Sequence, residues 1–243
     1  MNPTTTIHAA DGMAKPSSGG AYSGAFWERL WRTSGIQFVG FFLVTSLIYG
    51  YPPGVGAPTD ALAAFYNGDR TRILIASALF SLNLLNLLWF AAALRTTLAE
   101  AGQEGWGAAA TASSAVLGGL SLLSIAMGAA LSYSLARSGN PALMAGLNDL
   151  AWALGVLISF PRAMLVMSGV FGLWRAGWIS NTAFAVGVVA VVLEVMGGTT
   201  WLSGAWAPDG VYARFVAPGV LLIWAVGVSR VLLTRSPAAR AGW

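Results

Sequence analysis

The chain has 243 residues, of which 56% are hydrophobic and 9% charged, with 13 Lys and Arg against 9 Asp and Glu. Soluble domains have about 25% charged residues, so this composition excludes an ordinary soluble protein and indicates an integral membrane protein. The basic residues are scattered, which argues against nucleic-acid binding, and the absence of cysteine excludes disulfides, thiolate metal sites and cysteine nucleophiles.

The first 25 residues are small and polar and lack the apolar core of a signal peptide. We expect a disordered cytoplasmic tail at 1–25, a membrane domain at 26–235 and a short cytoplasmic tail at 236–243. The single histidine, His8, and the single lysine, Lys15, both fall in the first tail. We therefore expect no haem, zinc or copper site and no Schiff-base cofactor in the membrane domain.

Six apolar stretches approach or exceed the roughly 20 residues that a helix needs to cross a bilayer. They cover about 33–51, 71–94, 107–135, 147–174, 181–205 and 212–233. The first ends at the sequence YPPG, which cannot continue a helix. The predicted fold class is all-α, a polytopic membrane bundle of six transmembrane helices in one domain.

The positively charged residues predict the orientation, because cytoplasmic loops carry an excess of Lys and Arg. Eight such residues fall on the side of the termini and four on the opposite side. The first group is Lys15, Arg29, Arg32, Arg95, Arg175, Arg230, Arg235 and Arg240, and the second is Arg70, Arg72, Arg137 and Arg214. Both termini are therefore predicted to be cytoplasmic, in a multi-pass protein of a bacterial cytoplasmic membrane.

The connection Pro52–Arg70 is the longest outer loop. Its sequence TDALAAFYNG begins with the helix-capping residues Thr59 and Asp60 and ends with Asn-Gly. Leu62, Phe65 and Tyr66 share one face of the intervening turns. We expect a short helix on the outer membrane surface that either caps an outward cavity or only orders the connection.

Polar residues within the spans are the main candidates for a site, because ionisable groups in a bilayer are costly and usually face partners. Arg162 lies near the middle of the fourth span, directly after Pro161, and Glu194 lies at similar depth in the fifth. Pro161 has no backbone N–H, so we expect it to kink the helix of the fourth span. Helical phase places Glu194 on a face of small residues, which suits close helix packing. We predict a buried ion pair between Arg162 and Glu194, with Asn83 or Asn86 as additional hydrogen-bond partners.

This pair has two interpretations. It either locks the bundle or belongs to a polar cavity that binds a substrate group or relays protons through Glu194, since arginine stays charged. The third span carries a separate stripe of small polar residues, which we interpret as a close-packing face. The stripe consists of Ser114, Ser121, Ser124, Gly128 and Ser132.

Two segments, PTDALAAFYNGDRTRI at Pro58–Ile73 and LNDLAWALG at Leu147–Gly155, resemble those of a family of uncharacterised six-span actinobacterial membrane proteins. The resemblance covers residues of about 33–235 and implies the same six-helix fold, without a known activity. It also implies a role for residues near the outer membrane face. These are Phe65, Tyr66, Arg72, Asn148, Asp149 and Trp152.

Three functions stay open at this point. The first is a protein that binds or helps to move a small lipophilic or amphipathic molecule, with a pocket under the Pro52–Arg70 loop. The second is an intramembrane enzyme acting on a lipid or isoprenoid-like substrate, with Glu194 or Asp149 as general acid. The third is an accessory membrane subunit without a ligand. The first is favoured, because the two acids fall at different depths and no HExxH, GxSxG or P-loop motif occurs.

Overall fold

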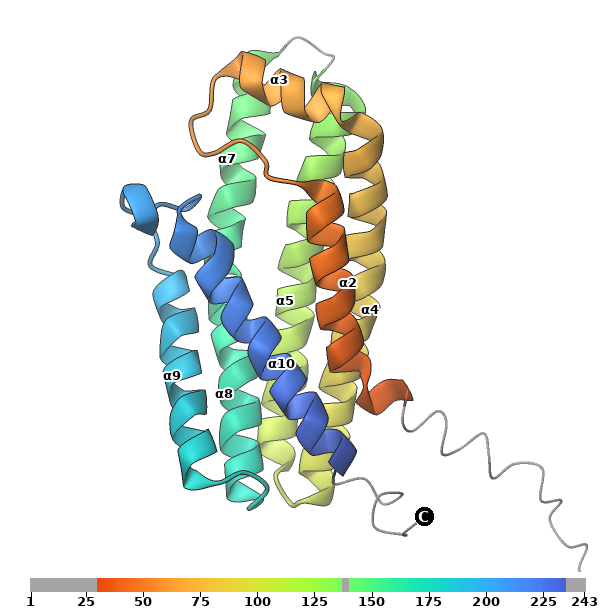
Figure 1. The fold of residues 1–243 in the computed structure, drawn as a ribbon, viewed down its shortest axis with the longest axis vertical. Coiled ribbons are helices and arrows are strands. Elements are labelled where there is room, and N and C mark those ends of the chain that lie inside the picture. Colours follow the sequence, from red (N-terminus) through yellow and green to blue (C-terminus); the bar gives the residue numbers. More distant parts are fainter. Residues whose placement is uncertain (1–29, 137–139, 235–243) are drawn as a thin grey trace, which may run out of the picture.

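The computed structural model describes residues 30–136 and 140–234, and every regular element in these two ranges is helical (Figure 1). The predicted all-α class is confirmed, whereas the predicted tails at 1–25 and 236–243 lie outside the described residues. The main helices are α2 (Ser34–Tyr49), α4 (Arg70–Glu100), α5 (Glu104–Ala130), α7 (Pro141–Leu157), α8 (Ser159–Arg175), α9 (Asn181–Gly197) and α10 (Ala217–Thr234), with the short α3 (Thr59–Gly68) between α2 and α4.

Four helical segments are long and apolar enough to cross a membrane. They are Arg70–Glu100, Glu104–Leu135, Pro141–Arg175 and Tyr212–Thr234. Helices α2 and α9 are also apolar, but they have only 16 and 17 residues. A helix of that length spans about 24–26 Å, somewhat less than the roughly 30 Å hydrocarbon core of a bilayer. The structure thus supports four of the six expected spans by length and composition.

Local sequence explains where several helices begin and end. The Asn140 side chain accepts a hydrogen bond from the N–H of Leu143, and Pro141 occupies the first turn of α7. Ser180 caps α9 in the same way. Helix α8 stops before Gly177, which has φ of +69°, a value that glycine adopts without strain.

The predicted fourth span consists of two helices separated at Ile158. Helix α7 ends at Leu157 and α8 begins at Ser159, because Pro161 has no N–H to donate to the carbonyl one turn earlier. The N–H of Arg162 resumes the ladder by donating to the Ile158 carbonyl at 3.2 Å. The interruption that Pro161 predicts is therefore present, and it lies directly beside Arg162.

The fifth span is shorter than predicted, whereas the last span, Tyr212–Thr234, agrees with the predicted range. The expectation that the fifth span continues to Ala205 is wrong, because α9 ends at Gly197 and the adjacent glycine pair disfavours helix. A short 3₁₀ turn follows at Gly204–Trp206. The last span begins with a π-helical turn, η4 (Tyr212–Val216), and Pro218 follows it as a residue that cannot donate to the helix ladder.

The helices form a closed ring. Helix α2 packs on α4, α4 on α5, α5 on α7 and α8, α8 on α9, α9 on α10, and α10 returns to α2. Figure 1 shows α3 lying across one end of this ring, while α2 begins and α10 ends at the opposite end. These two ends of the ring are referred to as the α3 end and the terminal end.

The terminal end of the ring is filled by a hydrophobic core. Phe90, Leu94, Leu165 and Trp224 are among its buried members and come from α4, α8 and α10. Phe90 and Trp224 meet edge to face with ring centroids 5.6 Å apart. Among the described residues, the terminal half of the ring is therefore tightly packed.

Helices α8 and α9 approach closely through glycine, as expected for the small-residue face of α9. A methyl group on Gly187 would lie 2.5 Å from a Val170 methyl, and one on Gly197 would lie 2.7 Å from Ser159 Oγ. Such distances are well below van der Waals contact, so these positions tolerate no side chain without movement of α8 or α9. The predicted packing of the Glu194 face is confirmed.

We expect Gly187→Ala to destabilise the protein by about 1–3 kcal/mol, because the added methyl group overpacks the contact between α8 and α9. Gly119→Ala, on α5, is the matched control, since nothing lies within 4 Å of its added methyl group. It should be neutral or about 1 kcal/mol more stable, through helix propensity. Thermal unfolding of the purified protein in detergent measures both, and equal melting temperatures would contradict the packing.

Candidate functional site

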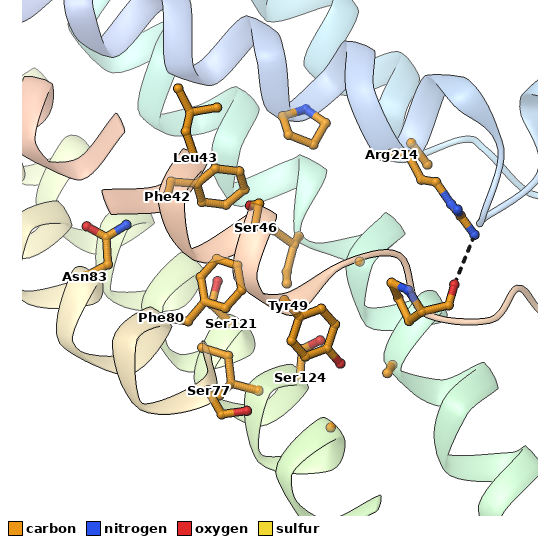
Figure 2. Close-up of a pocket in the computed structure, with 18 of the residues that line it drawn as sticks. Phe42, Leu43, Ser46, Tyr49, Ser77, Phe80, Asn83, Ser121, Ser124 and Arg214 are labelled. Carbon is orange, nitrogen blue, oxygen red and sulfur yellow. Dashed lines mark hydrogen bonds between the residues drawn. The ribbon is translucent and has the colours of Figure 1, made fainter. Parts of the chain in front are cut away.

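A cavity of about 820 Å³ occupies the α3 half of the ring (Figure 2). Its walls come from α2, α4, α5, α7, η4 and the start of α10, and α8 contributes Arg162. Most of the lining is apolar, with a few hydroxyl, amide and guanidinium groups among aromatic and aliphatic side chains. This volume and composition are typical of sites for small organic ligands.

The cavity is closed at the terminal end. Its deepest lining residues are Phe38, Leu87, Leu117 and Leu221, all of which also belong to the buried hydrophobic core. Below them the core is continuous, so no passage runs along the axis of the bundle through the described residues. The cavity is a one-sided pocket rather than a pore.

The roof at the α3 end is held by a network of hydrogen bonds around Asn148. The Tyr66 hydroxyl donates to Asn148 Oδ1 at 3.0 Å, and Asn148 Nδ2 donates to the Gly54 carbonyl at 3.0 Å. Trp152 Nε1 donates to the Pro53 carbonyl at 2.8 Å. Burial raises the pKa of the Tyr66 hydroxyl, so the hydroxyl stays protonated and remains a donor.

Asp149 completes this connection from the outer side. Its Oδ1 accepts a hydrogen bond from the N–H of Gly56 at 3.0 Å. The loop after α2 is therefore attached to α7 at three points, through Asn148, Asp149 and Trp152. Helix α3 adds Leu62 and Tyr66, both buried, to a second hydrophobic cluster above the cavity. The predicted short helix thus caps a cavity.

The six outer-face candidates gather at the α3 end, but they divide into two groups. Tyr66, Asn148 and Trp152 line the cavity. Phe65, Arg72 and Asp149 lie outside its lining. Arg72 forms an exposed ion pair with Asp69 at 2.6 Å and lies over the Phe65 ring at 6.0 Å.

One side of the cavity is open between α2 and η4–α10. These helices contact one another near the terminal end, where Arg32 Nη1 donates to the Leu232 carbonyl at 3.1 Å, and Figure 1 shows them diverging toward the α3 end. Leu43, Leu47 and Phe215 line the cavity there and are nevertheless 51%, 82% and 51% exposed. The entrance is therefore lateral and apolar.

Arg162 and Glu194 form the predicted ion pair. Arg162 Nε lies 3.3 Å from Glu194 Oε2, and the two side chains are 8% and 0% exposed. Arg162 Nη2 also donates to Ser159 Oγ at 2.7 Å. The backbone of Leu221 interacts with the Glu194 carboxylate, although neither carboxylate oxygen has a hydrogen bond of good geometry. The predicted ion pair is confirmed, but few hydrogen-bond donors other than Arg162 surround the Glu194 carboxylate.

The pair is asymmetric with respect to the cavity. Arg162 is part of the lining, whereas Glu194 is not and lies behind it on α9. The carboxylate therefore neutralises the guanidinium without reaching the space that a ligand would occupy. The geometry is compatible with both interpretations, a pair that locks the bundle and a pair that belongs to a polar cavity. The pair joins α8 to α9, and Arg162 also borders the cavity.

The prediction that Asn83 or Asn86 supports the ion pair is wrong. Asn83 Nδ2 donates to the Phe38 carbonyl at 3.0 Å, and Asn86 Nδ2 donates to Asn83 Oδ1 at 3.2 Å. Asn83 therefore joins α4 to α2, and Asn86 supports Asn83 within α4. Asn83 lines the cavity, whereas Asn86 does not.

The serine stripe of α5 also differs from the prediction. Ser121 and Ser124 face the cavity instead of a neighbouring helix (Figure 2). Close packing holds at Ser114 and Ser132, which are fully buried, and at Gly128, where an added methyl group would lie 2.8 Å from the Tyr49 hydroxyl oxygen. Helical phase correctly placed these residues on one stripe, but it could not tell a packed face from a cavity wall.

Arg214 is the main residue that sequence reasoning missed. It lies at the entrance of the cavity, stacks over the Trp152 ring at 4.7 Å and donates from Nη2 to the Pro52 carbonyl at 3.4 Å. In the sequence, Arg214 was only one of four basic residues on the outer side that predict the orientation of the spans. Its position at the start of the last span was the only available signal.

Comparison of the chain with protein-family models, curated proteins and solved structures gives no significant match. Within residues 30–136 and 140–234, no three acidic or histidine side chains come together as a metal site. The function is therefore argued from the cavity, its entrance and its polar groups.

We expect Glu194→Gln to destabilise the protein by about 3–5 kcal/mol, because it leaves the buried Arg162 charge uncompensated. Replacing both residues, as in Arg162→Met with Glu194→Met, should recover most of the loss. Asp69→Asn breaks an ion pair whose side chains are each 43% exposed and should cost no more than about 1 kcal/mol. Unfolding in detergent by added denaturant measures all three, and a Glu194→Gln loss no larger than that of Asp69→Asn would contradict a structural pair.

Proposed function

We propose that this chain is a six-span membrane protein whose α3 end faces away from the cytoplasm. Four long apolar helices and two shorter ones support this topology, as does the excess of basic residues on the side of both termini. The lateral entrance then opens into the hydrocarbon region of the bilayer. Its exposed apolar rim, Leu43, Leu47 and Phe215, suits that environment.

We further propose that the protein binds a lipophilic or amphipathic molecule that enters from the membrane. The observation that carries this proposal is a cavity of about 820 Å³ with a packed floor, a hydrogen-bonded roof and an apolar side entrance. A ligand that dissolves in the bilayer reaches such a site directly. A water-soluble ligand would have to pass the roof of α3 and its loop.

The geometry favours binding over the two other candidate functions. A buried general acid must reach the substrate, but Glu194 lies behind the cavity wall and Asp149 accepts a hydrogen bond from the Gly56 N–H on the outer side of the roof. An accessory subunit without a ligand has no need for an unfilled interior. If the protein also transports its ligand, the break between α7 and α8 at Ile158, beside Arg162, is the part of the cavity wall best suited to change conformation.

The topology is testable because the chain has no cysteine to remove. Thr59→Cys, on the exposed surface of α3, should react with a membrane-impermeant maleimide in intact cells or spheroplasts. Glu100→Cys, exposed at the end of α4 on the terminal side, should react only after the cells are opened. The reverse pattern would overturn the orientation, and equal labelling of both in intact cells would overturn the six-span topology.

The cavity is testable by filling it. Ser121→Phe with Ser124→Phe should lower crosslinking of the protein to phosphatidylcholine that carries a diazirine on its acyl chain by about tenfold, because the phenyl groups occupy the ligand volume. The control replaces Leu122 and Leu123, each 47% exposed on the outside of α5, with Phe and should leave cavity adducts unchanged. Mass spectrometry of crosslinked peptides locates the adducts, and undiminished labelling of α2 and α10 in the filled variant would refute a bound ligand.

A further inference from the structure

The cavity is lined by two cations and by no carboxylate. Arg162 and Arg214 are the charged lining residues. Arg162 is neutralised by Glu194 at 3.3 Å. Arg214 has no acidic partner within 4.0 Å among the described residues, where the ion pairs are Asp69–Arg72 and Arg162–Glu194. A net positive charge therefore remains at the entrance.

Arg214 is fixed in position while most of its donors stay free. Its Cζ lies 4.7 Å from the centroid of the Trp152 ring, and its one hydrogen bond to the described residues, from Nη2 to the Pro52 carbonyl, is long at 3.4 Å. Its Nε is buried and has no hydrogen-bond partner among the described residues. A guanidinium has five N–H donors arranged to grip an oxyanion in a bidentate manner, so the unused donors favour an anionic ligand.

Three acidic residues at the α3 end lie outside the cavity and leave the space beside Arg214 unfilled. Asp149 accepts from the Gly56 N–H outside the cavity, and Asp69 pairs with Arg72. The Asp209 carboxylate lies against Gly54, where a methyl group would collide with it. None of the three lines the cavity.

The depth of the cavity matches one leaflet of a bilayer. Along the last span, Tyr212–Thr234, the lining extends from Ala213 to Leu222, which is about 14 Å at the rise of an α-helix. Half of the hydrocarbon core of a bilayer is about 15 Å. Arg214, in the first turn of the last span, then lies at the level where lipid headgroups begin, and the apolar floor lies near the midplane.

We propose that the cavity holds an acyl chain of an anionic phospholipid from the leaflet at the α3 end, with the lipid phosphate bound by Arg214. This inference rests on the proposed function and names its ligand class. The chain enters between α2 and α10, past Leu43, Leu47 and Phe215, and its end reaches Phe38 and Leu87. The headgroup stays at the membrane surface beside Trp152.

The experiment compares phosphatidylglycerol with phosphatidylcholine of the same acyl chains, added to the delipidated protein in detergent and followed by native mass spectrometry. Wild-type protein should bind phosphatidylglycerol about tenfold more tightly, because the choline cation of phosphatidylcholine neutralises its phosphate and is repelled by Arg214. Arg214→Gln should lose this preference and keep its affinity for phosphatidylcholine, which shows that the cavity is still formed. Arg70→Gln removes a cation that lies over the Tyr133 ring, outside the cavity lining, and should keep the preference.

Each alternative result has a definite meaning. Equal binding of the two lipids by wild-type protein, or an unchanged preference in Arg214→Gln, overturns the proposed recognition of an anionic headgroup by Arg214 while leaving lipid binding in place. Binding that is insensitive to phenylalanine at Ser121 and Ser124 overturns the proposed function itself. Oleate that binds as tightly as phosphatidylglycerol, and equally through Arg214, would replace the phospholipid with a fatty acid.

Discussion

The interior of this bundle is organised around one buried ion pair. Arg162 and Glu194 meet at 3.3 Å with almost no exposure, and a permanent cation at this depth is tolerable only with a counter-ion. The requirement joins α8 to α9 and determines which face of each helix points inward. Glycines on α9 allow the close approach that brings the two charges together. A hydrophobic core lies on one side of this pair and a cavity on the other.

The shape of the cavity follows from how the helices close the ring. Helices α2 and α10 contact near the terminal end and diverge toward the α3 end (Figure 1). The short helix α3 covers the wide end of the ring, and its loop is attached to α7 by hydrogen bonds to carbonyls of Pro53 and Gly54. An interior that is sealed below and covered above can be entered only from the side. In a bilayer that side faces lipid, which is why the geometry supports a membrane-derived ligand.

The polar groups of the cavity differ in how fully they are used by the protein itself. Asn148 and Tyr66 are engaged in the roof, Asn83 is engaged with α2, and Arg162 is neutralised from behind. Arg214 keeps unused donors. This difference, rather than the number of polar residues, indicates where a ligand would be held.

Much of the fold was readable from the sequence. The apolar stretches predicted the long helices. Pro161 predicted the interruption of the fourth span, and the Thr-Asp and Asn-Gly pairs predicted the short helix α3. The pairing of Arg162 with Glu194 was also predictable, because a short loop makes adjacent spans antiparallel neighbours and places equal depths side by side. Composition and the basic residues led to a membrane topology that the long apolar helices support.

Only the tertiary structure decided which polar faces line a cavity. Ser121, Ser124 and Asn83 have the sequence pattern of packed helix faces, and periodicity identifies a face without its neighbour. Arg214 meets Trp152 and Pro52 only because the tertiary fold brings η4 close to α7 and to the loop after α2. The sequence by itself determined helices, depth and charge, since these are local properties. The cavity, its entrance and its free cation depend on how distant helices diverge, which no local pattern contains.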